Sequence, residues 1–550
     1  MADHNSMPGF NPRRANPQTL VNHTRALETF GDPQAALEIL LDRIGDGVKA
    51  PLVLRAASNL AATYADFDVL PLSEPGLLRL LNNQTVDRSP LARIAMFKAM
   101  SRWPLINIIG VGETGDWGAA ARMFLDAAAE IADDALFITA LETDPVQSFP
   151  LESLLIAVRA TLLHEPERLH DATTMRIAVA IIRQVELNES VWPKDDTEIK
   201  VVTDNPGFAL CALCGEWTPT DEHRLPKITD AGLKEWADAR IRAEARFRKA
   251  AEAIPSIGVV TDDVSLKVGA QYAEAPYPRW TSLSTPKEGE RLAMVRTLSD
   301  DNRLHGVKRP DVLIAGCGTG QHAIASALGY GGKASVLGID LSRASLSYAA
   351  IMAEIFAVRN LKLIQADLLE IDALGQSFDI IECIGVLHHT AKPLENWKRL
   401  LGVLKPGGVM TIGLYSATAR AGLSQFRNEL KRTNKAPNDN AMKILRRDMI
   451  QSPRNDFERA IVQSADFNTT SNLRDLLFNA HEIPLSLSEI RDFIDQQGLR
   501  FLRFDTPPAI SARFAEQHGS NSIGDLETWI DFEADNPDAF EGMYVFWVQA

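Results

Sequence analysis

The chain has 550 residues, 45% of them hydrophobic and 23% charged, which is typical of a globular protein and excludes collagen-like, disordered and disulfide-scaffold classes. A formal net charge of −15 disfavours attraction of the whole molecule to nucleic acid or an anionic membrane, although a local basic cluster could override this. A polar N-terminus, no long apolar run and only four cysteines predict a cytoplasmic protein without a membrane partner.

Residues 1–253 are expected to form an all-α domain of helical hairpins. Apolar residues recur at helical spacing in six segments separated by glycine or proline, namely 35–44, 52–65, 91–100, 119–131, 151–163 and 174–185. A longer helix is expected over 230–253, before Pro255. No clean period of about 34 residues is visible. Tetratricopeptide-like repeats and an irregular helical bundle therefore both remain open.

Residues 254–285 are expected to form an extended connector between two domains. The connector holds a cluster of aromatic residues, proline and arginine that includes Tyr272, Tyr277, Arg279 and Trp280. The cluster allows two interpretations. It could close over a bound ligand as a lid, or it could pack between the two domains.

Residues 286–550 are expected to form an α/β domain with a doubly wound, largely parallel sheet. Short apolar runs at 311–315, 334–340, 361–365, 378–383 and 408–414 are predicted strands, with helical segments at 321–328, 343–356 and 393–404 between them. Two more strands are predicted near the end, at 499–504 and 543–548. A helical insert is expected at about 419–482.

A glycine-rich loop follows the first predicted strand of this domain and begins a helix. Gly316, Gly318 and Gly320 have the spacing G-x-G-x-G, and glycine allows backbone to approach a ligand closely. Gln321 replaces the glycine that a dinucleotide fingerprint requires, and no Lys-Ser/Thr pair closes the loop as in a phosphate-binding Walker A motif. The loop therefore predicts a different ligand.

Two aspartates end the second and third predicted strands. Asp340 lies 20 positions after Gly320, where its carboxylate can accept hydrogen bonds from two ribose hydroxyls, and Asp367 can accept from the amino group of an adenine. Ligands of open α/β sheets bind at the carboxyl ends of the strands. The loop and both acids are predicted to meet there.

This set of motifs resembles class I S-adenosylmethionine (SAM)-dependent methyltransferases, and so do residues 385–389 (GVLHH) and 404–408 (LKPGG). The resemblance implies a seven-stranded Rossmann-like sheet whose last strand is antiparallel, with SAM as cofactor. The cofactor-binding residues that it implies are Gly316, Cys317, Gly318, Gly320, Asp340, Leu341, Asp367, Leu368 and Cys383.

A narrower resemblance covers about 254–548. Residues 272–280 (YAEAPYPRW) are similar to the Y-x-x-x-P-Y-P-R-W signature of bacterial proteins that fuse a tetratricopeptide-like region to a methyltransferase, and residues 412–416, 471–478 and 543–547 also match. As a lid, the cluster would place Arg279 on the methionyl carboxylate of SAM. The substrate-binding residues expected on this basis are Tyr272, Tyr277, Arg279, Trp280, Tyr415 and Arg474.

His388, after the fourth strand, is the first candidate for a catalytic base or positioning residue, although the His388–His389 pair could simply cap the next element. Cys211 and Cys214 form half of a zinc motif, with His223 as the only nearby candidate ligand, so no metal is expected. In the insert, residues 427–454 hold eight Lys or Arg and three acids. This basic segment could attract an acidic or phosphorylated acceptor, or could form a solvated helical face.

The sequence therefore predicts a SAM-dependent methyltransferase whose helical half recruits a protein or peptide acceptor. A small-metabolite acceptor is the second hypothesis, and a non-catalytic SAM-binding scaffold is the third. Nucleic acid is disfavoured by charge and by the absence of an Asn/Asp-Pro-Pro-aromatic motif after the fourth strand, where residues 382–385 read ECIG.

Overall fold

The computed structural model describes residues 11–64, 67–204, 207–217, 228–274, 276–298, 303–433 and 438–550. Contacts divide the chain into two compact units. The helical unit comprises Met1–Glu244, Thr281–Thr285 and Ala436–Leu473, and the sheet unit comprises Ala245–Trp280, Pro286–Lys435 and Arg474–Ala550. The first boundary thus lies at Glu244 and not at 253, and both Thr281–Thr285 and part of the expected insert group with the helical unit.

The helical unit contains the predicted N-terminal helices. They are α1 (Pro17–Thr29), α2 (Pro33–Gly45), α3 (Pro51–Thr63), α4 (Glu74–Leu81), α5 (Ser89–Met100), α6 (Leu105–Glu113), α7 (Trp117–Asp126), α8 (Ala128–Asp133), α9 (Ala135–Leu141), α10 (Phe149–His164), α11 (Ala172–Leu187), α12 (Asp196–Asp204), α13 (Phe208–Leu213) and the beginning of α14 (Ala231–Ala253). Several begin at a local cap: the side chains of Asp32, Asp116 and Asp171 each accept a hydrogen bond from a backbone N–H three residues ahead.

One helical prediction needs correction, since the segment 119–131 is not a single helix. Helix α7 ends at Asp126 and α8 begins at Ala128. The two are separated by Ala127, which closes α7 and precedes α8. Helix lengths in the described part of the unit run from six residues in α8 to sixteen in α10. The type of repeat stays a prediction.

The helical unit is completed by a segment that comes from far along the chain. Helices α21 (Asp439–Gln451) and α22 (Asp456–Val462) belong to it. The guanidinium of Arg446, fully buried on α21, forms two hydrogen bonds of 2.6 and 2.8 Å with the carboxylate of Glu152 on α10. Ser471 also donates to Glu189 through its backbone N–H at 2.7 Å. The basic segment is therefore not a uniformly solvated face, because Arg446 is buried in an ion pair.

The sheet unit is built on eight strands, namely β1 (Ser256–Ile257), β2 (Asp311–Ala315), β3 (Ser335–Asp340), β4 (Leu361–Ala366), β5 (Phe378–Ile384), β6 (Leu404–Leu414), β7 (Arg500–Phe504) and β8 (Tyr544–Gln549). Their order is β1-β4-β3-β2-β5-β6-β8-β7, and β8 is antiparallel to both of its neighbours. The expected seven strands are all present. The count is corrected to eight because Ser256–Ile257 pairs with the edge of β4.

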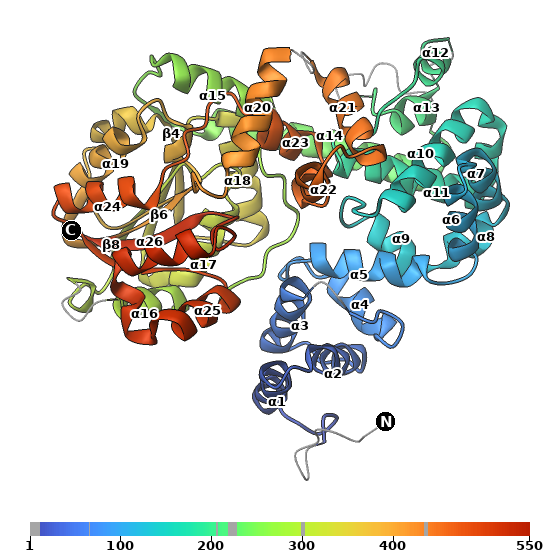
Figure 1. The fold of residues 1–550 in the computed structure, drawn as a ribbon. Coiled ribbons are helices and arrows are strands. Elements are labelled where there is room, and N and C mark those ends of the chain that lie inside the picture. The colour runs from blue at the N-terminus through green and yellow to red at the C-terminus, as the bar shows by residue number, and fades with distance from the viewer. Residues whose placement is uncertain are drawn as a thin grey trace. The chain divides into compact units, whose positions relative to one another are not determined.

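Helices cover both faces of this sheet (Figure 1). Those that contribute buried side chains to its two cores are α16 (Glu290–Arg296), α17 (Gln321–Tyr330), α18 (Arg343–Ile355), α19 (Pro393–Gly402), α24 (Leu487–Gln496), α25 (Pro508–His518) and α26 (Leu526–Asp535). The unit also contains α15 (Asp263–Glu274), α20 (Ala421–Thr433) and part of α23 (Thr470–Phe478). In β2, Val312 and Ile314 face a core shared with α16 and α17, whereas Leu313 and Ala315 face a core shared with α19 and α24. This alternation makes a three-layer α/β unit, as predicted.

The expectation of an extended connector is wrong for its central part. Residues Asp263–Glu274 form the helix α15, which begins where the side chain of Asp262 accepts hydrogen bonds from the backbone of Val264 and Ser265 at 3.0 and 2.9 Å. Trp280, farther along the segment, is 6% exposed. Within the described residues of both units, no helix has the length and apolar content needed to cross a membrane.

Candidate functional site

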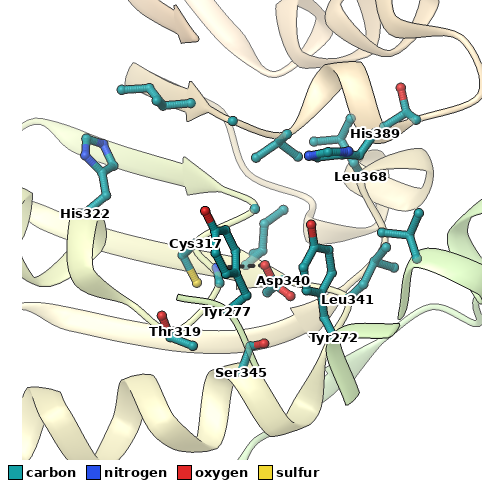
Figure 2. A pocket seen from close by; sticks show the side chains of 18 of the residues that line it. Tyr272, Tyr277, Cys317, Thr319, His322, Asp340, Leu341, Ser345, Leu368 and His389 are labelled. Atoms are coloured by element: carbon teal, nitrogen blue, oxygen red, sulfur yellow. Dashed lines mark hydrogen bonds between the residues drawn. The ribbon is translucent and has the colours of Figure 1, made fainter. Parts of the chain in front are cut away.

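A cavity of about 480 Å³ opens at the carboxyl ends of the central strands of the sheet unit (Figure 2). This volume lies within the usual range of small-molecule sites. Ten of the predicted site residues line it: Tyr272, Tyr277, Gly316, Cys317, Gly318, Asp340, Leu341, Asp367, Leu368 and Tyr415. The predicted residues that are not among its lining are Arg279, Trp280, Gly320, Cys383, His388 and Arg474.

The glycine loop forms the floor of this cavity, and its glycines have different roles. All three have positive φ, at 69°, 53° and 88° for Gly316, Gly318 and Gly320. A Cβ on Gly316 would lie 2.3 Å from Val386, whereas a Cβ on Gly320 would lie 2.6 Å from that of Ala349. Gly320 is therefore required for packing α17 against α18, and Gly316 and Gly318 shape the wall that a ligand meets.

Asp340 ends β3 and braces the loop. Its Oδ2 accepts a hydrogen bond of 2.8 Å from the backbone N–H of Gly318, and its Oδ1 accepts one of 2.8 Å from Ser342. Burial raises the pKa of its carboxyl above the ordinary value, and the hydrogen bonds from Ser342 and Gly318 oppose that rise. Each oxygen keeps a second lone pair, so the carboxylate can still accept from hydroxyl groups of a ligand.

Asp367 directly follows β4, and its Oδ1 accepts from the backbone N–H of Leu369 at 2.9 Å. Leu341 and Leu368, which directly follow the two acids in the sequence, also line the cavity and add apolar surface of the kind that a purine ring contacts. Cys317 lines the cavity as well. Burial raises the pKa of its thiol well above the ordinary value, so it remains a protonated wall residue at neutral pH.

Cys383 does not contribute to the cavity, although it was expected to bind the cofactor. It is fully buried within β5, where burial raises the pKa of its thiol to about 12. Its side chain belongs to the core between β5 and the helices of one face. Alternation along β5 places it there, since successive side chains point to opposite faces of a strand.

Helix α15 and the residues after it cover part of the cavity. The rings of Tyr272 and Tyr277 are stacked, with centroids 6.4 Å apart, and both lie beside Asp340 (Figure 2). The segment is fixed to the glycine loop, because the hydroxyl of Thr319 donates to the carbonyl of Pro278 at 2.6 Å. This arrangement favours the lid interpretation for the two tyrosines.

Trp280 and Arg279 have other positions than expected. The indole of Trp280 packs against Phe356 at a ring distance of 5.7 Å, and its N–H donates to the carbonyl of Thr319 at 3.2 Å. Trp280 is therefore an anchor behind the loop. Arg279 is exposed and is not part of the cavity lining.

The two histidines after β5 have different surroundings, and only His389 lines the cavity. His388 is fully buried, and its Nδ1 accepts from the backbone N–H of Tyr415 at 3.3 Å. Burial, His389, Arg420 and Arg427 hold the pKa of its imidazole well below the ordinary value, so it is neutral. His389 instead lines the cavity (Figure 2), and its Nδ1 lies 2.8 Å from the carbonyl oxygen of His481. That contact requires a proton on Nδ1 and leaves the lone pair of a neutral ring on Nε2.

A buried carboxylate behind the loop was not assigned a role from the sequence. Glu382 on β5 pairs with Arg291 of α16 and with His322 of α17, each at 2.7 Å. It also accepts from the hydroxyls of Ser326 and Tyr330 at 2.7 and 2.6 Å. Arg291 and the contact with His322 keep the pKa of its carboxyl well below the ordinary value despite burial. Because His322 lines the cavity, this network fixes one of its walls.

On α23 the cavity residue is Asp475, and the expected Arg474 lies next to it in an ion pair with Glu274 of α15 at 3.2 Å. Within the motif at 471–478, Asp475 is the residue that lines the cavity. Tyr415 does line the cavity, with the guanidinium of Arg420 3.5 Å from the centre of its ring.

The half zinc motif is not completed in the described part of the chain. Burial raises the pKa of the Cys214 thiol to about 11, and no three His, Cys, Asp or Glu side chains among the described residues gather as metal ligands. His223 lies outside the described residues.

Comparison with known families now bears on this geometry. Residues 308–474, which include the glycine loop and both strand-end acids, match the model of a methyltransferase domain. The chain contains a SAM-dependent methyltransferase domain. Its last strand, β8, is antiparallel to its neighbours, as the resemblance implied.

The curated relatives have names that indicate different substrates, and one is uncharacterised. An uncharacterised protein of Synechococcus sp. is 28% identical over 255 residues, which are 44% of this chain and 60% of that protein. The ubiquinone biosynthesis O-methyltransferase of Acinetobacter baylyi is 34% identical over 20% of this chain and 44% of its own. The tRNA U34 carboxymethyltransferase of Methylococcus capsulatus is 31% identical over 22% of this chain and 38% of its own. The chain thus spans 60% or less of each of these relatives.

Among solved structures, PKMT2 from Rickettsia typhi in complex with AdoHcy aligns over 52% of both chains, with 16% identity and a TM-score of 0.32.

The residues of the methyltransferase domain fit SAM as judged from the cavity itself. Gly316 and Gly318 bring bare backbone to the cavity, and the cavity offers carboxylate acceptors for hydroxyl and amino groups together with apolar side chains. SAM is the cofactor of this class of domain, and the side chains and backbone that would hold it are those of the loop, Asp340, Leu341, Asp367 and Leu368.

Proposed function

We propose that the chain is an enzyme that transfers a methyl group to a protein or peptide, and that its helical unit recruits this acceptor. The observation that carries the enzymatic part is the single cavity that brings the glycine loop, Asp340 and Asp367 together with polar groups not needed for the cofactor. SAM supplies a methyl group bound to a positively charged sulfur, so an acceptor needs alignment more than strong activation.

Different residues of the cavity bind the donor, enclose the acceptor and accept the proton. The loop and the two strand-end aspartates hold the donor, while Tyr272, Tyr277 and Tyr415 enclose the acceptor and exclude water. We place the proton acceptor at His389 instead of His388, because His389 lies on the wall and its Nε2 carries the lone pair. His388 supports it by fixing the backbone of Tyr415.

A small metabolite is the second candidate acceptor. It is favoured by the name of a relative, the ubiquinone biosynthesis O-methyltransferase of Acinetobacter baylyi. Nucleic acid remains less favoured, because none of the described residues that line the cavity is a lysine or arginine.

The test is transfer of labelled methyl from SAM by the full-length protein in a cell lysate, with the label then sorted into protein, RNA and small molecules. Label in protein supports the proposal, label in small molecules supports the second candidate, and label in RNA contradicts both. Binding of SAM without any transfer would indicate a non-catalytic scaffold.

A further inference from the structure

Asp475 is a buried carboxylate on the cavity wall that cofactor binding does not account for. It is 5% exposed, lies on α23 and lines the same cavity as Asp340 and Asp367. The hydroxyl of Tyr272 donates to its Oδ1 at 2.8 Å, and the amide of Asn479 donates to the same oxygen at 2.7 Å. Its Oδ2 has no hydrogen bond to any described residue.

The positive charges nearest to Asp475 are engaged elsewhere. Arg427 donates to its backbone carbonyl at 2.8 Å, but the guanidinium pairs with Glu482 at 2.7 Å. Arg474 pairs with Glu274. Burial and the neighbouring Asp475 raise the pKa of Tyr272 well above its ordinary value, so Tyr272 keeps its proton and acts as the donor. The carboxylate is thus oriented through Oδ1 by two neutral donors, Tyr272 and Asn479.

The rest of the lining has the same electrostatic character. Three carboxylates, those of Asp340, Asp367 and Asp475, line the cavity, and among its described lining residues there is no lysine or arginine. Aromatic rings of Tyr272, Tyr277 and Tyr415 form part of the wall. A partly desolvated wall of aromatic faces with an oriented carboxylate favours a cation over a neutral or anionic group.

We infer that the acceptor is an amine, and that Asp475 binds its ammonium form through Oδ2 and orients the nitrogen for methylation. This inference rests on the proposed methyltransferase function and specifies its substrate class. The ammonium loses one proton to Nε2 of His389, and the freed nitrogen lone pair forms the bond to the methyl carbon. The methyl–sulfur bond breaks with its electron pair remaining on sulfur, and the positive charge passes to the methylated nitrogen.

Two sources of an amine share this chemistry, a free small amine and a lysine or N-terminal amine of a peptide. Binding can be measured without turnover on the full-length protein saturated with S-adenosylhomocysteine. The probes are n-butylamine and n-butanol, which have similar shapes but differ in charge, and the readout is their dissociation constant by titration with nuclear magnetic resonance. We expect butylamine to bind about tenfold or more tightly than butanol.

Asp475→Asn is the decisive variant, because an asparagine can keep Oδ1 for Tyr272 and Asn479 while replacing Oδ2 by an amide donor. It should lose the preference for butylamine and leave the affinity for S-adenosylhomocysteine within about twofold. Asp456→Asn, a nearly fully exposed carboxylate on α22, removes the same charge and should change neither affinity.

Equal binding of the two probes to the wild-type protein, or loss of S-adenosylhomocysteine affinity in Asp475→Asn, would overturn the inference; in the second case Asp475 belongs to the donor site. Failure of the wild-type protein to bind S-adenosylhomocysteine would instead contradict the proposed function. With labelled SAM, transfer to lysine peptides or to free butylamine supports the inference and identifies the source. Transfer to hydroxyl acceptors alone overturns it.

Discussion

At the scale of single residues, the donor side of the site follows directly from local sequence, whereas the acceptor side does not. Asp340 and Asp367 end predicted strands, so their position at the edge of the sheet follows from topology. Which of His388 and His389 faces the cavity depends on the conformation of the single turn after β5. Asp475 is oriented by Tyr272, a residue 203 positions earlier in the chain. The positions of His389 and Asp475 at the cavity are therefore not indicated by the residues next to them in the sequence.

The Asp340→Ala variant should lose most of its SAM affinity. The carboxylate offers lone pairs to ligand hydroxyls and also holds the N–H of Gly318, so we expect a loss of about tenfold or more. Calorimetric titration measures it. Asp372→Ala, an exposed acid after β4, is the matched control and should bind normally. Normal SAM binding by Asp340→Ala would contradict the assignment.

The lowered pKa of His388 predicts that the folded protein becomes less stable in acid. Its pKa is held well below 6.5 in the folded protein, so at lower pH the unfolded state binds more protons and stability falls as pH drops below about 6.5. The maximal slope for one histidine is about 1.4 kcal/mol per pH unit. Thermal unfolding across pH 5–8 tests this: His388→Asn, which can still accept from Tyr415, should show a shallower decline than the wild type. Parallel declines would show that His388 is not responsible.

At the scale of elements, the sheet could be predicted from sequence better than the segment before it. All seven expected strands are present, because each is a compact apolar run between helices. Strand β1 has only two residues and depends on pairing with β4, so it has no pattern of its own. Helix α15 did have a capping signal at Asp262, which the surrounding prolines and aromatic residues obscured.

The turn between β2 and α17 provides an element-scale prediction. In Gly320→Ala the new Cβ would lie 2.6 Å from Ala349, on a backbone with φ of 88°. We expect destabilisation by about 1–3 kcal/mol from crowding with about 1–2 kcal/mol more from the left-handed conformation. Gly375→Ala has a φ of 59° but no atom within 4 Å, so it isolates the backbone contribution. Chemical denaturation of both variants measures the difference, and equal losses would refute the packing role.

At the scale of the whole molecule, the helical unit combines three stretches of chain, the last of which is far from the first. Residues 439–462 supply α21 and α22, whose sequence pattern was correctly read as helical but was attributed to an insert of the methyltransferase domain. Local periodicity identifies a helix without identifying its partner. The partner of Arg446 is 294 positions earlier, a distance that no sequence window covers.

Arg446→Ala should therefore destabilise the helical unit strongly. It would leave the carboxylate of Glu152 buried without a counter-ion, which costs about 3–5 kcal/mol. Arg447→Ala, one residue along, removes a half-exposed arginine paired with Asp448 and should cost about 1 kcal/mol or less. Differential scanning calorimetry compares the two. Equal melting temperatures for both variants would contradict the importance of the buried pair.

The same ion pair has a consequence for how the protein is made. During translation Glu152 leaves the ribosome long before Arg446 is synthesised. The N-terminal helices therefore first form without the arginine that pairs with this carboxylate in the folded protein. The helical unit can reach its final packing only after the glycine loop, Asp340 and Asp367 have already been translated. Folding of the N-terminal helices is thus completed only after most of the methyltransferase domain has been synthesised. A chain that ends before Arg446 lacks the counter-ion of Glu152 as well as the C-terminal strands of the sheet.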